Sequence, residues 1–227
     1  MKPKIAFFDT KPYDLAIELI LSFAAKMKSK HNFELKELNV GGGFAVQYTL
    51  DSPAPPVSAY ADVLASKIIS QCQELKLRQP RLIIEPGRAI VGQAGVALYR
   101  VGVVKDIPGV RCYVSVDGGM ADNIRPALYG SRYEAVVANK ASASTAKTVT
   151  IAGKFCESGD ILIKDIDLPP VAAGDIIAIP DCGAYCLPMA SNYNASFKPP
   201  IILVKEGKVL LIRRRETIDD LTRCDVV

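Results

Sequence analysis

A thiol and a carboxylate stand side by side at Cys156 and Glu157, in the turn Cys-Glu-Ser-Gly-Asp between two apolar runs. A cysteine in a polar turn is not required for core packing, so its thiol is a candidate for chemistry. With an ordinary pKa of about 8.5, such a thiol can donate a proton at neutral pH. The alternative interpretation is an ordinary turn.

Three consecutive glycines, Gly41, Gly42 and Gly43, follow the short apolar run 35–40. Glycine lacks a Cβ atom and tolerates positive φ, so backbone N–H groups in such a loop can converge on an anion. A tight turn that merely needs glycine is the alternative interpretation.

Glu85, Gly87 and Arg88 follow the next apolar run, 81–84, in the segment Glu-Pro-Gly-Arg. In parallel α/β folds, ligands bind at the loops that follow the carboxyl ends of the strands. Arg88 can hold a carboxylate or a phosphate through two parallel hydrogen bonds, and Glu85 can hold a protonated ring nitrogen. A structural ion pair explains this motif equally well when it is taken alone.

Two further motifs pair polar groups with turns. Arg125 lies four residues before Tyr129, and Tyr185 ends the segment Gly-Ala-Tyr that precedes Ser-Asn-Tyr-Asn. Each stretch can also be an ordinary turn with core residues.

The elements that must position these residues change character near residue 93. Before it, two helical patterns alternate with the two strand-like runs, which is typical of a parallel sheet with crossover helices. The first helix is predicted over residues 11–30, with apolar positions at Ala16, Leu19, Ile20, Phe23 and Met27, and the second over 60–75. Two strands and two helices cannot close a barrel, and an open piece would leave strand edges and apolar faces exposed. Either another polypeptide completes it, or the chain associates with copies of itself, or it is a truncated product.

Beyond residue 93 the pattern predicts an antiparallel β domain, because β-rich runs are separated by glycine, proline and aspartate turns. The segment 205–208, Lys-Glu-Gly-Lys, is predicted to connect a hairpin. The predicted strands are 95–105, 111–117, 147–153, 160–168, 175–180 and 201–214.

Composition excludes several classes of function. The net charge is +4, and the one basic cluster, Arg213 to Arg215, precedes acidic residues, which favours a solvated face over nucleic-acid binding. No apolar run reaches the roughly 18 residues that a membrane span needs, so a cytoplasmic protein is expected. Cys182 and Cys186 are four residues apart, but zinc needs two more ligands and the single histidine, His31, stands alone, so no metal is expected.

In this order and spacing, the motifs resemble the diaminopimelate decarboxylase family of fold-type-III pyridoxal-phosphate decarboxylases, from about Asp9 to the segment Arg-Glu-Thr-Ile-Asp-Asp-Leu. The resemblance implies an architecture of α/β plus all-β, that is, an α/β part followed by an all-β part. Residues 1–92 would form the last strands and helices of a partial (β/α)8 TIM barrel that binds pyridoxal 5'-phosphate. Residues 93–227 would form a C-terminal antiparallel β-barrel domain. The resemblance also implies a homodimer with active sites at the interface.

The same resemblance assigns roles by position. Gly41, Gly42, Gly43 and Gly87 would bind the cofactor phosphate, and Glu85 would face the pyridine nitrogen. Arg88, Arg125 and Tyr129 would hold substrate carboxylate, with Arg88 and Tyr185 close to both cofactor and substrate. Cys156 would donate the proton, and Glu157 would bind the distal ammonium group of meso-diaminopimelate, which is decarboxylated to L-lysine.

One feature of the family has no match here, because no residue before Asp9 corresponds to the lysine that binds the cofactor covalently. A separate N-terminal barrel fragment is therefore a possible partner. The alternatives are an ornithine, arginine or carboxynorspermidine decarboxylase, or an inactive truncated homologue. Glu157 disfavours the first of these, since those relatives tend to carry aspartate after the cysteine.

Overall fold

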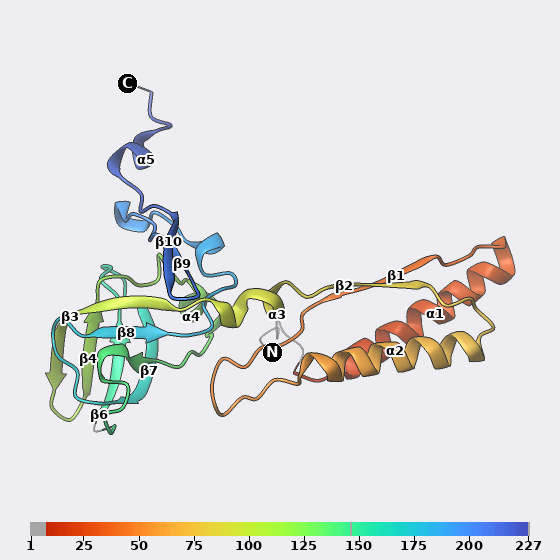
Figure 1. The fold of residues 1–227 in the computed structure, drawn as a ribbon, viewed down its shortest axis with the longest axis horizontal. Helices are drawn as coiled ribbons and strands as arrows, with labels where there is room; N and C mark the ends of the chain where they lie inside the picture. Colours follow the sequence, from red (N-terminus) through yellow and green to blue (C-terminus); the bar gives the residue numbers. More distant parts are fainter. Residues whose placement is uncertain (1–7, 146, 227) are drawn as a thin grey trace. The chain divides into compact units, whose positions relative to one another are not determined.

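The computed structural model describes residues 8–145 and 147–226, and the chain divides into two compact units, Met1–Gln93 and Ala94–Val227 (Figure 1). Each unit has its own secondary structure and is described separately. Among the described residues, no helix combines the length and the apolar character needed to cross a membrane.

Unit 1 alternates helices with two parallel strands, as the sequence predicts. Glu37 pairs with Arg81, and the ladder runs to the pair Gly42 and Glu85, with a shift in register between Asn39 and Gly42. α1 and α2 pack against each other along one side of the strand pair (Figure 1). The elements are α1 (Lys11–His31), β1 (Glu37–Gly42), α2 (Val57–Glu74), β2 (Arg81–Glu85), α3 (Gly87–Val91) and the 3-10 helix η1 (Gly92–Ala94), which reaches the boundary of the unit.

The core of unit 1 uses a different face of α1 from the predicted apolar positions. The helix buries Tyr13, Ile17, Leu21 and Ala24, whereas the predicted Leu19 and Phe23 are 72% and 61% exposed. Both sets follow helical spacing, so periodicity alone cannot choose between them. The choice is made by packing against Leu38 of β1 and against the apolar side of α2, which includes Tyr60, Leu64, Ile68 and Cys72.

Unit 2 is built on a six-stranded sheet in the order β5-β8-β3-β4-β6-β7. Burial alternates along β4, where Cys112, Val114 and Val116 are buried, as expected for a sheet with one face in the core. The strands are β3 (Ala97–Ile107), β4 (Arg111–Val116), β5 (Val136–Val137), β6 (Lys147–Ala152), β7 (Ile161–Leu168) and β8 (Ile176–Ile179). The helices are α4 (Arg125–Tyr129), α5 (Ile218–Thr222) and the 3-10 helices η2 (Ala138–Lys140), η3 (Leu187–Met189) and η4 (Tyr193–Ala195).

The prediction of a wholly antiparallel β-barrel is corrected by this topology. β4 and β6 pair in parallel, with Tyr113 opposite Thr150, so the sheet is mixed. The chain between β4 and β6 is long enough to contain α4, β5 and η2, and a long crossover is what a parallel pair requires. The sheet order has two ends, β5 and β7, and within the part of the chain that the structure describes no ladder joins them.

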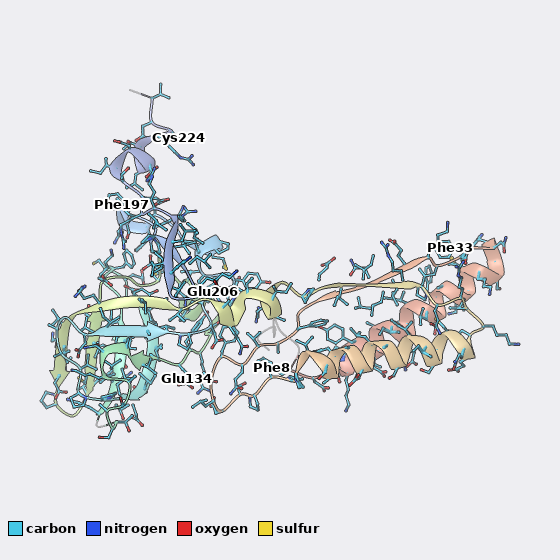
Figure 2. All side chains as sticks on the ribbon, viewed as in Figure 1. Phe8, Phe33, Glu134, Phe197, Glu206 and Cys224 are labelled. Carbon is cyan, nitrogen blue, oxygen red and sulfur yellow. The ribbon has the colours of Figure 1, made fainter. Side chains whose placement is uncertain are left out.

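The predicted hairpin is confirmed as β9 (Ile201–Lys205) and β10 (Lys208–Arg213), a separate two-stranded antiparallel sheet. Lys205 pairs with Lys208, and the two turn residues between them, Glu206 and Gly207, have φ of 51° and 75°. Two successive positive φ values are typical of the tight turn that matches the twist of a hairpin. Figure 2 labels Glu206 at this turn.

Candidate functional site

The glycine loop and Glu85 lie next to each other at the carboxyl ends of β1 and β2. Asn39 donates from Nδ2 to Glu85 Oε1 at 2.7 Å, and Asn39 Oδ1 accepts from the backbone N–H of Gly41 at 2.8 Å. One amide side chain therefore holds both the carboxylate and the start of the glycine loop. Asn39 was not among the predicted site residues.

Gly42 is required by the close approach of the two strands. A Cβ atom at Gly42 would lie 2.0 Å from the backbone oxygen of Glu85. On the other side, the Tyr13 hydroxyl donates to the Gly42 carbonyl at 2.7 Å. Burial raises the pKa of that hydroxyl to about 12, so Tyr13 stays a donor at neutral pH.

Gly87 and Arg88 begin the short helix α3. A Cβ atom at Gly87 would meet no other atom within 4 Å, so packing does not explain the glycine there. Arg88 is buried, and its guanidinium carbon lies 5.8 Å from the centre of the Tyr48 ring, which is cation–π distance. The open space beside Gly87 can admit a ligand oxygen close to the backbone.

In unit 2, the structure brings together Arg125, Tyr129 and Tyr185. The Arg125 guanidinium carbon lies 5.7 Å from the Tyr129 ring centre and 5.6 Å from that of Tyr185. Arg125 also donates from Nε to the Tyr133 hydroxyl at 3.0 Å and from a terminal nitrogen to Ser131 Oγ at 3.4 Å. The arginine is buried and its orientation is fixed by these contacts.

Cys156 and Glu157 lie in another loop of unit 2, between β6 and β7, and both are exposed. The Glu157 carboxylate accepts from the backbone N–H of Gly159 at 3.1 Å and from Ser158 Oγ at 3.3 Å, so it folds back onto its own turn. The loop of Cys156 and Glu157 is therefore a separate feature from the contacts among Arg125, Tyr129 and Tyr185.

Asp160 fixes the loop that carries Cys156. Its carboxylate accepts from the backbone N–H groups of Met120 at 2.6 Å and Phe155 at 2.8 Å. Burial raises the pKa of the Asp160 carboxyl, and these two donors oppose that rise. Two glycines make room for the carboxylate, because a Cβ at Gly119 or Gly153 would lie 2.4 or 2.1 Å from its oxygens.

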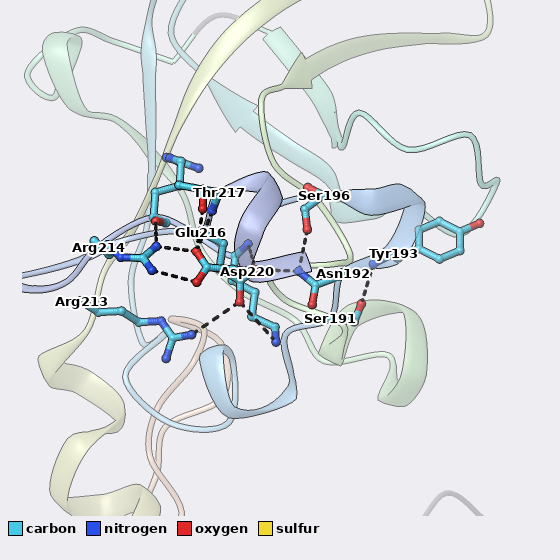
Figure 3. A network of polar contacts seen from close by, with 11 residues as sticks. Ser191, Asn192, Tyr193, Ser196, Arg213, Arg214, Glu216, Thr217 and Asp220 are labelled. Atoms are coloured by element: carbon cyan, nitrogen blue, oxygen red, sulfur yellow. Dashed lines mark hydrogen bonds and ion pairs between the residues drawn. The ribbon is translucent and has the colours of Figure 1, made fainter. Parts of the chain in front are cut away.

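The C-terminal basic cluster is an exposed, ion-paired surface, as expected for a solvated face. Arg214 binds the Asp220 carboxylate with both terminal nitrogens, and Arg213 lies 3.8 Å from Glu216 (Figure 3). Glu216 accepts from Asn192 Nδ2 at 2.6 Å and from the backbone N–H of Lys198 at 2.8 Å. This network ties the Ser-Asn-Tyr-Asn motif to the segment after β10.

Three positioning residues were missed by the sequence reasoning, namely Asn39, Tyr133 and Asp160. A signal existed for Asp160, because it closes the turn that begins at Cys156 in the sequence. No comparable signal marked the other two, because their partners are 46 and 8 residues away. Within residues 8–145 and 147–226, no three metal-binding side chains form a cluster, and all six cysteines are free.

Comparison with known proteins identifies the family that this chain resembles. Residues 13–183 match the sequence profile of the pyridoxal-dependent decarboxylases, C-terminal sheet domain. The chain is 45% identical over 219 residues to diaminopimelate decarboxylase of Bacillus subtilis, covering 96% of this chain and 50% of the relative.

Solved structures give the same result. The crystal structure of diaminopimelate decarboxylase from M. jannaschii is 34% identical, with a TM-score of 0.90 over 97% of this chain and 50% of that one. The same enzyme in complex with L-lysine gives a TM-score of 0.89. The chain spans about half the length of the relatives it matches. It belongs to the pyridoxal-dependent decarboxylase family.

Proposed function

We propose that this chain is the C-terminal portion of a diaminopimelate decarboxylase, which converts meso-diaminopimelate to L-lysine with pyridoxal 5'-phosphate. The observation that carries the proposal is the similarity to named diaminopimelate decarboxylases over 96% of the chain. The local geometry of both units supports it, since each contains a preformed group of residues suited to part of the reaction.

The residues of unit 1 fit the cofactor. The loop of Gly41, Gly42 and Gly43, together with the open space at Gly87, suits a phosphate. Glu85, oriented by Asn39, suits a protonated pyridine nitrogen. When bound, the cofactor supplies an electron-accepting ring that stabilises the negative charge left after loss of carbon dioxide.

The residues of unit 2 fit an amino acid with a carboxylate at each end. Arg125 is a buried cation next to Tyr129 and Tyr185, and it would bind a carboxylate of the substrate. Arg88 of unit 1 would bind substrate or cofactor oxygens. Cys156 would donate a proton to the carbon that loses carbon dioxide, and Glu157 would bind the distal ammonium group.

A further polypeptide is proposed to complete unit 1. Apolar residues of α1 that the core does not use remain exposed, among them Leu15 (60%), Leu19 (72%) and Phe23 (61%). The strand pair also exposes Leu82 and Ile84 of β2. A parallel pair with such surfaces is typical of part of a larger sheet. We propose an N-terminal barrel fragment as the partner, and a homodimer as the assembly.

Co-expression with the N-terminal half of a diaminopimelate decarboxylase tests the function. The complex should release lysine and carbon dioxide from meso-diaminopimelate and show the visible absorbance of bound cofactor. Cys156→Ala should lower kcat strongly and leave KM nearly unchanged, because a proton donor acts in the transition state. Cys224→Ala, at the other exposed cysteine, is the matched control and should have no effect. Cofactor binding without turnover would favour an inactive homologue.

Substrate choice separates the proposal from an ornithine-type decarboxylase. Ornithine lacks the distal carboxylate, so a buried arginine that binds this group would lose its negatively charged partner. That loss costs roughly 2–5 kcal/mol, or about thirtyfold to several thousandfold in specificity constant. Arg125→Ala should reduce this preference together with the activity. Preference of the unsubstituted complex for ornithine would replace the diaminopimelate assignment.

A further inference from the structure

Glu216, just after the hairpin of β9 and β10, closes a loop of residues 192–198. Its Oε2 atom accepts from Asn192 Nδ2 at 2.6 Å and from the backbone N–H of Lys198 at 2.8 Å. The bond from Lys198 and, more weakly, that from Asn192 hold the pKa of the Glu216 carboxyl below its ordinary range, while desolvation opposes the shift. One ionised oxygen atom therefore binds both ends of the 192–198 loop.

The 192–198 loop has a backbone that needs such a closure. Asn194 and Ala195 have φ of 51° and 55°. The left-handed region is unfavourable for residues with a Cβ atom, and such residues stay there only when their surroundings hold them. Asn192 Nδ2 also donates to the Ser196 carbonyl at 2.9 Å, across the two left-handed residues. Because Asn192 makes this bond, the Glu216 carboxylate that fixes its amide also fixes the shape of the loop.

Tyr193 of this loop packs against the Cys156 loop, residues 153–160. The Tyr193 and Phe155 rings meet edge to face, with centres 5.7 Å apart and an interplanar angle of 67°. Phe155 directly precedes Cys156, and its backbone N–H donates to Asp160. Figure 3 shows the Tyr193 ring pointing away from the polar network around Glu216. The polar side of the loop thus binds Glu216, and its aromatic side contacts the neighbour of Cys156.

A second contact joins the same parts of unit 2. The backbone N–H of Ser191 donates to the Ala121 carbonyl at 2.9 Å. The residue before Ala121 is Met120, whose backbone N–H donates to the Asp160 carboxylate at 2.6 Å. The chain next to the 192–198 loop is therefore bonded to the turn onto which Asp160 fastens the Cys156 loop.

We propose that Glu216 is a positioning residue for Cys156. It acts on the backbone of the 192–198 loop through Asn192, and the loop acts on the Cys156 loop through the contact of Tyr193 with Phe155. The inference rests on the proposed function only in the role of Cys156 as proton donor. It gives the acidic residue within the C-terminal basic cluster a task beyond pairing with surface charges.

Deuterium exchange of the Phe155 amide, measured by nuclear magnetic resonance on the full chain, reports on the Cys156 loop without any turnover. Division by the exchange rate of the Val114 amide, in the centre of β4, removes a general change in the stability of unit 2. Glu216→Ala should raise this ratio about tenfold, because two hydrogen bonds to a carboxylate are lost. Glu216→Gln keeps an oxygen acceptor and should stay within about threefold of the unsubstituted chain.

Two matched controls separate this path from a general loosening of the tail. Asp220→Ala removes the ion pair with Arg214 from the same network and should leave the ratio unchanged (Figure 3). Tyr193→Phe keeps the ring and should also leave it unchanged, whereas Tyr193→Ala should raise it. Glu216→Ala combined with Tyr193→Ala should raise the ratio by much less than the product of the two single effects, because both act through one contact.

Turnover in the complex with an N-terminal half tests the link to the reaction. Cys156→Ala should lower kcat by a smaller factor in the Glu216→Ala background than in the unsubstituted complex, because a displaced donor contributes less to lose. In the Asp220→Ala background the factor should be the same as in the unsubstituted complex. A complex that binds cofactor without turnover would refute the proposed function, and the exchange ratios would still decide whether Glu216 positions the Cys156 loop.

Three results would overturn the inference. The first is an unchanged exchange ratio in Glu216→Ala, and the second is an equal rise in Glu216→Ala and Asp220→Ala. The third is a pair of effects for Glu216→Ala and Tyr193→Ala that multiply in the double variant, because the two side chains would then act on the Cys156 loop independently.

Discussion

Replacement of Gly42 by alanine should separate the two strands at the carboxyl end of unit 1. The new Cβ would lie 2.0 Å from the Glu85 carbonyl oxygen and 3.0 Å from its carbonyl carbon. Both atoms belong to the backbone, so no side chain can rotate away, and relief requires the β1–β2 pairing to open. Overpacking typically costs about 1–3 kcal/mol, and this rigid contact should reach about 3 kcal/mol or more.

Two neighbouring glycines provide matched controls. Gly41 has φ of 76° with open space around its Cβ position, so Gly41→Ala should cost only the left-handed backbone, about 1–2 kcal/mol. At Gly87 there is neither a close contact nor a positive φ, and alanine there should leave stability unchanged or raise it by up to about 1 kcal/mol. If Gly87 lines the phosphate site, Gly87→Ala should still weaken cofactor binding in the complemented complex.

The assay must report on unit 1 alone, because a chain with two units need not unfold in one step. Cys72 is 1% exposed in unit 1 and Cys112 is 4% exposed in unit 2, so their labelling against urea concentration gives a midpoint for each unit. The urea midpoint reported by Cys72 should be highest for Gly87→Ala, lower for Gly41→Ala and lowest for Gly42→Ala. The urea midpoint reported by Cys112 should be the same in all three variants. Equal Cys72 midpoints for the Gly42 and Gly87 variants would refute the close approach of the two strands.

Three further outcomes are expected. Tyr13→Phe should destabilise unit 1 by about 1 kcal/mol in the Cys72 assay, because it removes the hydrogen bond to Gly42. Lys140 and other donors lower the pKa of Asp175 to about 2, so its stabilisation is complete above about pH 4 and lost as the pH falls through 2. Asp175→Asn should therefore cost about 2 kcal/mol at neutral pH and flatten acid unfolding in that range, measured by urea titration. Amides of β9 and β10 should exchange with deuterium much faster than those of β4, because isolated two-stranded hairpins are marginally stable.

Local signals predicted most elements of this chain. Periodicity and turn chemistry, which act over a few residues, predicted α1, α2, the parallel pair and the hairpin turn at Glu206 and Gly207, but not the short helices α3, α4 and α5. The parallel pairing of β4 with β6 could not be predicted in this way, because it depends on where a long connection returns to the sheet. Strand patterns are the same for both directions of pairing.

The sequence predicted some residues of the candidate site and missed the side chains that orient them. Residue types and order indicated Arg125, Tyr129 and Tyr185, and the structure brings these three together. The side chains that orient them were not predicted, because a hydroxyl such as that of Tyr133 gains its role only from a tertiary contact. The roles of Cys156 and Glu157 remain predictions until turnover is measured.

The difference between the apolar positions noted for the first helix and the face that α1 buries has a physical cause that also bears on assembly. A helix with one apolar stripe has one possible buried side, but α1 has two, along Tyr13, Ile17 and Leu21 and along Leu15, Leu19 and Phe23. The first stripe meets β1 and α2 within unit 1. The second has no counterpart in that core, and three large apolar side chains more than half exposed are costly in water. Such a helix suits a position between two layers of neighbours, which is the position that an additional barrel fragment would give it.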